Sequence, residues 1–133
     1  MSKTSGLGWT TCSVDDASGT PVVIKNDVTS LQFATPRAVQ DVTGIDKSAN
    51  ERLLLLADAS ITLETVFNPA GAHTVFSTVS STSVARTTTL VVSAKTLAME
   101  MLYTDYPFQR SATGEATISV PGVLADGTVP TWS

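Results

Sequence analysis

Hydrophobic and polar residues alternate along much of the chain with the two-residue period of β-strands. The alternation is clearest where Ile61, Leu63 and Phe67 fall on one side of the chain and Thr62 and Glu64 fall on the other. Other segments with strand composition or alternation are 10–14, 21–25, 28–35, 37–42, 84–93, 97–103 and 115–120. So many short strands, joined by mostly short connections, predict a mainly β protein with an antiparallel β-sandwich or β-barrel fold.

One short segment changes to the helical period. Asn68-Pro69 ends the preceding strand, and Ala72, Val75, Phe76 and Val79 then follow at the spacing of one helix face. A helix of about two turns is not stable alone in water. We therefore expect a short α-helix at 72–79 that flanks the sheet.

The segment 46–56, with the sequence DKSANERLLLL, fits neither period cleanly. Asp46 or Ser48 can cap a helix and Glu51 can occupy its first turn, which predicts a turn of helix before the leucines. The leucine run at 53–56 is interpreted as core. A subset of it is expected to face a neighbouring subunit, because successive side chains cannot all point into one sheet face.

The 133 residues suffice for one hydrophobic core, and no linker or internal repeat divides the sequence. We expect a single domain over 1–133, with a flexible N-terminal arm at 1–9 and a C-terminal tail at 123–133. The residues at 15–19 are typical of a turn, so the strands on either side of it are predicted to form a β-hairpin.

The charge of the chain bears on its partners. Only 15% of the residues are charged, and the formal net charge is -4 with a sequence pI near 4.7. A protein that grips phosphates needs a basic surface, so nucleic-acid binding is disfavoured. The same acidity suits a surface along which DNA passes without being bound.

Residues able to carry chemistry are few. His73 is the only histidine and Cys12 the only cysteine, so neither a Ser-His-Asp set nor an intramolecular disulfide is indicated. His73 is interpreted as a polar residue at a helix entry and Cys12 as a small buried side chain. The segment 41–51 is not a calcium loop, because Asp46 stands where such a loop needs glycine. We expect no catalytic, metal-binding or cofactor-binding residues, and no enzyme.

Targeting signals are not evident either. Residues 1–8 lack the apolar core of a signal peptide, and no stretch approaches the roughly 18 apolar residues of a membrane span. We expect synthesis in the cytoplasm and no membrane insertion.

Several motifs follow one another in a distinctive order after residue 42. TGID precedes the leucine run, ASITLETVFNP closes the next strand, and AHTVFSTVSSTSVARTTTL comes after it. The series ends with LYTDYPFQRSATGEATISVPGVLADGTVPTWS. In this order the chain resembles the major tail tube proteins of long-tailed bacteriophages and of related phage-like or gene-transfer particles.

The resemblance implies a structural virion protein. Its fold would be two packed antiparallel sheets flanked by the helix at 72–79. Six copies would form a ring, and rings would stack around a tape-measure protein into the tail tube, the conduit for DNA delivery to the host. Tail-terminator and tip proteins would be further partners, DNA would pass without specific binding, and assembly would take place in the host bacterial cytoplasm.

Two sets of residues are candidates for roles in such a tube. An acidic tube lining is predicted from the carboxylates Asp27, Asp58, Glu64 and Glu100. Inter-subunit contacts are predicted for Trp9, Asp16, Arg37, Arg52, Arg86, Arg110 and Trp132. Ring-to-ring contacts are assigned to the segments 1–9, 16–19 and 123–133.

Two other classes of protein share this composition. A head-decoration or other virion structural protein would also be β-rich, and would form trimers or pentamers. A carbohydrate-binding β-sandwich would present exposed aromatic side chains on one sheet face, for which Trp9, Tyr103, Tyr106 and Trp132 are the candidates.

Overall fold

A computed structural model describes residues 3–133. A single 3-10 turn, Gly6–Gly8, precedes the strands. The strands are β1 (Trp9–Asp15), β2 (Pro21–Val23), β3 (Val28–Ala34), β4 (Arg37–Asp41), β5 (Arg52–Ala57), β6 (Ser60–Thr65), β7 (Arg86–Val92), β8 (Lys95–Tyr103), β9 (Phe108–Arg110) and β10 (Ala116–Leu124). One α-helix, α1 (Ala72–Phe76), lies between β6 and β7. The mainly β fold with one short helix confirms the predicted class.

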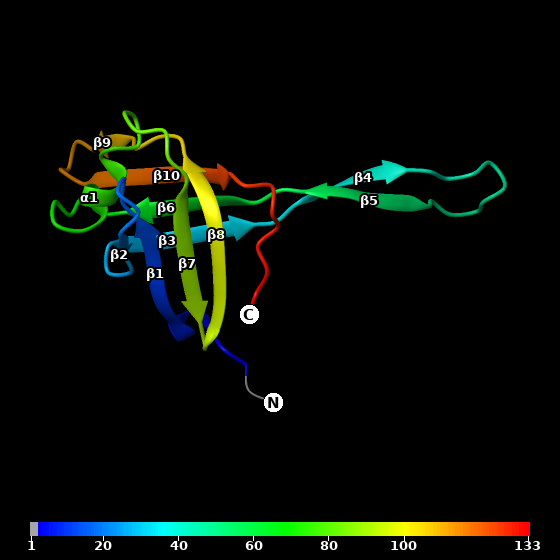
Figure 1. Cartoon of the computed structure of the whole chain (residues 1–133), viewed down its shortest axis with the longest axis horizontal. Coiled ribbons are helices and arrows are strands. Elements are labelled where there is room, and N and C mark those ends of the chain that lie inside the picture. The colour runs from blue at the N-terminus through cyan, green and yellow to red at the C-terminus, as the bar shows by residue number, and fades with distance from the viewer. Residues whose placement is uncertain (1–2) are drawn as a thin grey trace.

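Eight of the strands form one antiparallel sheet in the order β2-β1-β7-β8-β10-β6-β3, with β9 paired to β10. The sheet folds over on itself into two layers whose strands cross at a steep angle (Figure 1). One layer holds β2, β1, β7 and β8, and the other holds β10, β6 and β3 with β9. Strands β2 and β3 are the two ends of the order, so the sheet does not close into a barrel.

The core lies between the two layers. Alternate residues of β8, including Leu97, Met99 and Met101, are buried, and Ile61 and Leu63 of β6 meet them from the other layer. Helix α1 packs Ala72, Val75 and Phe76 into the same cluster. The helix ends at Phe76, earlier than the predicted residue 79.

A buried carboxylate fixes the start of α1. Asp27 is 6% exposed. Its Oδ2 accepts a hydrogen bond from the Ala72 amide at 2.9 Å and its Oδ1 one from Asn68 Nδ2 at 2.9 Å. A Cβ at Gly71 would lie 2.3 Å from Asp27 Oδ2, so glycine is needed beside it. Asp27 therefore presents no charge to solvent, which corrects its prediction as a lining residue.

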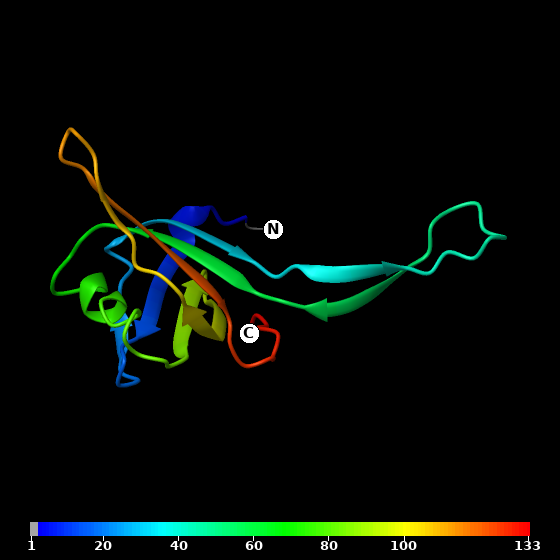
Figure 2. The same cartoon turned by 90° about the horizontal axis from the view of Figure 1, so that it is seen from above.

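Strands β4 and β5 form a separate two-stranded sheet that continues from β3 and β6 and projects far from the two layers (Figure 2). We call residues 37–57 the projecting hairpin. At its base the Asp58 amide donates to the Pro36 carbonyl at 2.9 Å. Near its tip the Val42 amide donates to the Glu51 carbonyl at 2.9 Å, and the Thr43 Oγ1 accepts from the Glu51 amide at 2.8 Å.

The helical turn predicted at 46–56 is wrong. Cross-strand pairing decides the conformation, because Val39 lies opposite Leu54 and Gln40 opposite Leu53 in an antiparallel ladder. The leucines are also not core: those at 53–56 are all exposed in the subunit. A local helical preference is overridden here by hydrogen bonds to a strand more than ten residues away.

The C-terminal tail lies along the part of β8 that does not pair with β10. The Ser133 amide donates to the Thr96 carbonyl and the Thr96 amide to the Ser133 carbonyl, each at 2.9 Å. Trp132 bridges to Leu97 between them. Of the predicted N-terminal arm, Met1 and Ser2 lie outside the described residues. No helix within 3–133 combines the length and apolar character needed to cross a bilayer.

Thr65 offers a test of the packing. Its hydroxyl is buried and makes no hydrogen bond in the structure. Thr65→Val should raise the free energy of unfolding by about 1 kcal/mol, because a buried hydroxyl without a partner carries an uncompensated desolvation cost. Chemical denaturation at neutral pH measures this, with Thr62→Val on the half-buried outward side as the control. A loss of stability in Thr65→Val would mean that the hydroxyl has a partner.

Candidate assembly surfaces

The projecting hairpin is an apolar surface that the rest of residues 3–133 leaves uncovered. Leu53 is 53% exposed and Leu54 is 62% exposed. Adjacent residues of a strand point to opposite faces, so both faces of the ribbon carry an exposed leucine. Val39, opposite Leu54, and Ile45 at the tip are exposed as well. An exposed apolar surface of this kind marks an interaction site.

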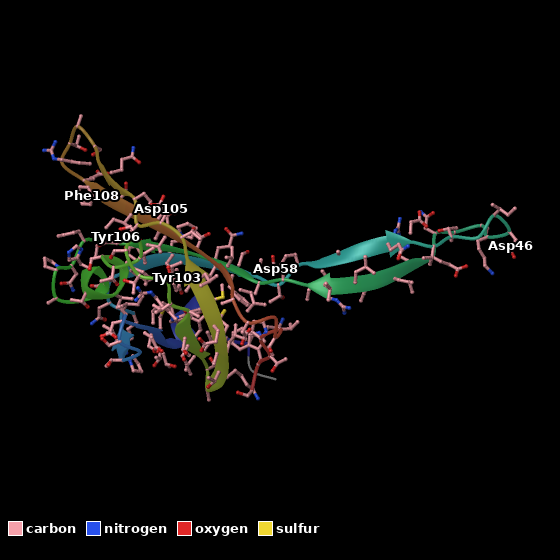
Figure 3. The ribbon with its side chains drawn as sticks, turned by 45° about the horizontal axis from the view of Figure 1, so that its top comes forward. Asp46, Asp58, Tyr103, Asp105, Tyr106 and Phe108 are labelled. Atoms are coloured by element: carbon pink, nitrogen blue, oxygen red, sulfur yellow. The ribbon has the colours of Figure 1, made fainter. Side chains whose placement is uncertain are left out.

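A second exposed apolar surface lies at the opposite end of the long axis. We call it the end patch and define it as Val66, Phe67 and Phe108. Phe67 is 43% exposed and Phe108 is 55% exposed, and their rings meet edge to face with centroids 5.7 Å apart. Figure 3 shows Phe108 at this end and Asp46, at the tip of the projecting hairpin, at the other.

The end patch is held from behind by further rings. The His73 ring lies 4.8 Å from that of Phe67, and its Nδ1 is 3.2 Å from the Tyr106 hydroxyl. Tyr106 in turn stacks on the buried Phe76 with centroids 6.0 Å apart. The position of His73 at the start of α1 matches its predicted place. Nothing in the sequence indicated that these rings come together.

The third surface is the outward face of β3, β6 and β10. In register, Glu64 lies between Ser30 and Ser119, and Thr62 lies between Gln32 and Pro121. Strands β3, β6 and β10 contain no lysine or arginine, and Glu64 is their single acidic residue. This face is therefore a hydroxyl-rich surface with one negative charge per copy.

The predicted lining carboxylates do not share one surface. Glu64 lies on the outward face of one layer, whereas Glu100 lies on the outward side of β8 in the other layer and accepts a hydrogen bond from the Thr87 hydroxyl. Asp58 is exposed at the base of the projecting hairpin (Figure 3). With Asp27 buried, Glu64 alone stands on the face of β3, β6 and β10.

Arg86 is also placed differently from its prediction as a contact residue. It is 1% exposed, and its guanidinium donates to the Asp15 carbonyl at 3.1 Å and to the Thr78 hydroxyl at 2.9 Å. Burial lowers the pKa of Arg86, and the Asp16 carboxylate opposes that shift. Arg86 therefore joins β7 to the helix region inside the subunit and does not reach a neighbour.

The other predicted contact residues are spread over the surface. Arg37 and Arg52 belong to the projecting hairpin, where the Arg37 guanidinium donates to the Leu55 carbonyl at 2.9 and 3.1 Å. Arg110 is exposed on β9 at the other end. The remaining three are half-buried Trp9, Asp16 in the β1–β2 turn, and exposed Trp132.

The aromatic candidates for a carbohydrate surface do not gather on one sheet face. Tyr103 is buried and its hydroxyl lies 2.6 Å from that of Thr88 inside the core. Tyr106 backs the end patch, while Trp9 and Trp132 lie on β1 and on the C-terminal tail. Across residues 3–133 no cluster of three or more His, Cys, Asp or Glu side chains is arranged to hold a metal ion.

Cys12 is buried in the core, and burial raises its pKa from 9.0 to about 12. Burial likewise raises the pKa of Tyr103. A thiol that stays protonated is a poor nucleophile, because the thiolate is the reactive form. Cys12 has the environment of a structural residue.

These two shifts predict a loss of stability in alkali. Above pH 9 the unfolded chain releases the Cys12 proton, whereas the native chain retains it until about pH 12. Deprotonation then favours the unfolded state, by about 1 kcal/mol at pH 10 for Cys12 alone. Denaturation series at pH 8 and pH 10 measure the fall, and Cys12→Ala should make it smaller, while the contribution of Tyr103 remains. An identical fall in that variant would exclude Cys12 as a cause.

Comparisons with known proteins bear on the fold. No protein-family model matches the chain, and no curated protein matches it. Among solved structures it is similar to a chain from the "Virion of native gene transfer agent (GTA) particle", with a TM-score of 0.76 and 15% identity over 98% of this chain and 99% of that one. It is similar to another from the "Tail of empty GTA particle computed with helical refinement, C6 symmetry", with a TM-score of 0.72 and 18% identity over 98% of each chain.

These similarities extend over nearly the whole chain at low sequence identity, so they establish a shared fold. The chain therefore has the fold of chains from the virion and tail of a gene transfer agent particle, in agreement with its resemblance to the tail tube proteins of phage-like particles.

Proposed function

We propose that this protein is a non-enzymatic structural subunit of a phage-like tail, in which six copies close into a ring and rings stack into a tube that conducts DNA. The observation that carries the proposal is the similarity, over 98% of the chain, to a tail chain in a particle refined with C6 symmetry. The open sheet agrees with it, because its end strands β2 and β3 leave backbone groups for a neighbouring copy to pair.

The outward face of β3, β6 and β10 supports a role as the tube lining. A polyanion slides along a surface that offers it no cationic groups, and these strands carry none. Six copies would place a ring of Glu64 carboxylates around the channel. Their repulsion of phosphates would keep DNA off the wall at short range, within a Debye length of about 8 Å.

Electron microscopy of the purified protein, concentrated until it polymerises, tests the proposed function. Hollow tubes built from stacked six-fold rings are the expected result, with the symmetry taken from end-on views. Closed trimers or pentamers would instead favour a head-decoration protein. Monomers at every concentration would overturn the proposal.

Reversing the charge at Glu64 should impair DNA passage and spare assembly. Glu64→Lys places six cations on the proposed lining of each ring, and we expect about a tenfold loss of DNA delivery by particles that carry it. Transfer of a marker gene, normalised to the number of intact tails, is the measurement. Glu115→Lys changes the net charge equally on the β9–β10 turn and serves as the control. Unchanged delivery by the Glu64 variant would place Glu64 outside the channel.

A further inference from the structure

The side of β8 that faces away from β7 is only partly covered between residues 96 and 100, and we call this side the β8 edge. The Thr96 amide and carbonyl bond to Ser133 here. The Glu100 carbonyl accepts a hydrogen bond from the Ala125 amide at 3.0 Å. Backbone groups of every second residue point to the same side of an antiparallel strand, so those of Ala98 face the β8 edge too. No group within residues 3–133 hydrogen-bonds to Ala98 on this side.

The gap arises because the tail is too long to follow β8. Four steps along β8, from Thr96 to Glu100, correspond to eight steps along the tail, from Ala125 to Ser133. The tail therefore arches away from β8, with a turn at Gly127, whose φ is +73° (Figure 1). An open cavity of about 330 Å³ lies beneath the arch, with β8 on one side and tail residues on the other.

The tail is a weak cover for the β8 edge. The hydrogen bonds that attach it to β8 lie at its two ends, and Trp132 remains 53% exposed. A straight strand would keep the bonds to Thr96 and add bonds to Ala98 and to the Glu100 amide, which the arch leaves without partners. The β8 edge is therefore an acceptor for an added strand that the tail occupies incompletely.

Charge selects the strand that fits better. Glu100 and Asp126 both line the cavity, and its lining includes no lysine or arginine. The salt bridges found within residues 3–133 involve neither carboxylate. A residue opposite Glu100 on an added strand would have its Cβ about 5 Å away, where a cation is attracted and an acid is repelled. The β8 edge thus favours a basic segment over an acidic one.

We propose that the β8 edge binds an extended basic segment of a partner protein, which displaces the tail and adds a strand to β8 with a lysine or arginine opposite Glu100. The tail acts as a strap that covers the edge in the absence of this segment, because an unpaired strand edge invites indiscriminate pairing. The β8 edge lies in the other layer from the Glu64 face, so this binding is independent of the proposed tube.

Two labelled peptides test the charge of the partner. Both copy residues 127–133 with Pro130→Val, and they differ only in carrying Val129→Lys or Val129→Glu. When the last serine pairs with Thr96 as Ser133 does, position 129 lies opposite Glu100. Fluorescence anisotropy with the full chain, below the concentration at which it polymerises, should show about tenfold tighter binding of the lysine peptide. Glu100→Lys in the protein should reverse this preference.

A reversible lock on the tail tests the displacement. Thr96 and Ser133 exchange two hydrogen bonds, so their α-carbons lie about 5.5 Å apart, within the range of a disulfide. In the double variant Thr96→Cys with Ser133→Cys, oxidation should abolish binding of the lysine peptide and reduction should restore it. The buried Cys12 does not compete.

Three outcomes would overturn the proposal. Equal binding to the oxidised and reduced forms would place the peptide away from the β8 edge. Absence of binding to the reduced form, or equal affinity for the two peptides, would mean that the edge does not accept a basic strand. An oxidised variant that runs as a covalent dimer would show that the tail of a second copy occupies the edge in place of a partner. None of these outcomes bears on tube formation, which electron microscopy tests separately.

Discussion

Replacing both Leu53 and Leu54 with aspartate is expected to abolish tube formation and leave the subunit folded. Both side chains are exposed in the subunit, so their replacement removes no core contact. The melting temperature should stay within about 2 °C of the unmodified protein. Electron microscopy and sedimentation velocity should show only separate rings or monomers at concentrations where the unmodified protein forms tubes.

The expected effect on tube formation is large because every copy in the tube carries the same two substitutions. Burying a leucine contributes about 2 kcal/mol, and placing a carboxylate in an apolar contact adds a desolvation cost of similar size or larger. With six copies in each proposed ring, the loss applies to the hairpin of every copy in the proposed tube. A loss of binding free energy that would only weaken a single contact is therefore expected to prevent tube formation.

The control adds the same two charges without touching an apolar surface. Ser81→Asp with Ser83→Asp changes two exposed residues in the loop before β7. This variant should form tubes at the concentration of the unmodified protein. Tubes of normal length from the leucine double variant would show that the projecting hairpin is not required for stacking.

The sequence predicted the β-strands of the two layers because their burial is decided within one subunit. Ile61 and Leu63 face the core and Glu64 faces out, so the period of two is visible in the sequence. The stripe through Ala72, Val75 and Phe76 predicted α1 for the same reason. In both cases the hydrophobic pattern reports contacts inside the chain that carries it.

The extended segment predicted at 37–42 matches β4, but β5, the second strand of the projecting hairpin, is not predicted because that condition fails there. A ribbon that is apolar on both faces has no alternation, and the leucines at 53–56 show none. Helix-forming residues around Glu51 then dominated the interpretation, whereas pairing between Val39 and Leu54 decides the structure. If a second copy covers this ribbon, the pattern records contacts between chains.

Buried charges and the end patch were missed for a different reason. Asp27 binds Ala72 from 45 residues away, and Arg86 binds Asp15 from 71 residues away. Phe67 and Phe108 likewise meet only because β9 pairs with β10 and β10 with β6. Carboxylates and arginines look alike in a sequence whether they are solvated or buried. Their roles become visible only when the layers are assembled.

Gly122 is a position where a single substitution should damage the subunit. It lies on β10 at the corner between the two layers, opposite Ile61 on β6 and Tyr103 on β8. A Cβ there would sit 2.9 Å from Ile61 Cγ2 and 2.9 Å from Tyr103 Cε1, closer than van der Waals contact allows. No other side chain fits unless one layer moves.

We expect Gly122→Val to lower the free energy of unfolding by about 3 kcal/mol. The Tyr103 ring cannot swing away, because its buried hydroxyl lies 2.6 Å from that of Thr88 and its ring meets Phe76. Relief would therefore separate β10 from β8, which is the junction that holds the two layers together. Chemical denaturation followed by circular dichroism measures the loss.

Gly6→Ala is the control. The added Cβ meets no atom within 4 Å, so the free energy of unfolding should stay within about 0.5 kcal/mol of that of the unmodified protein. Equal stability of the two variants would mean that β10 can shift to accommodate a side chain without loss of stability. Gly122 would then be unnecessary for joining the layers.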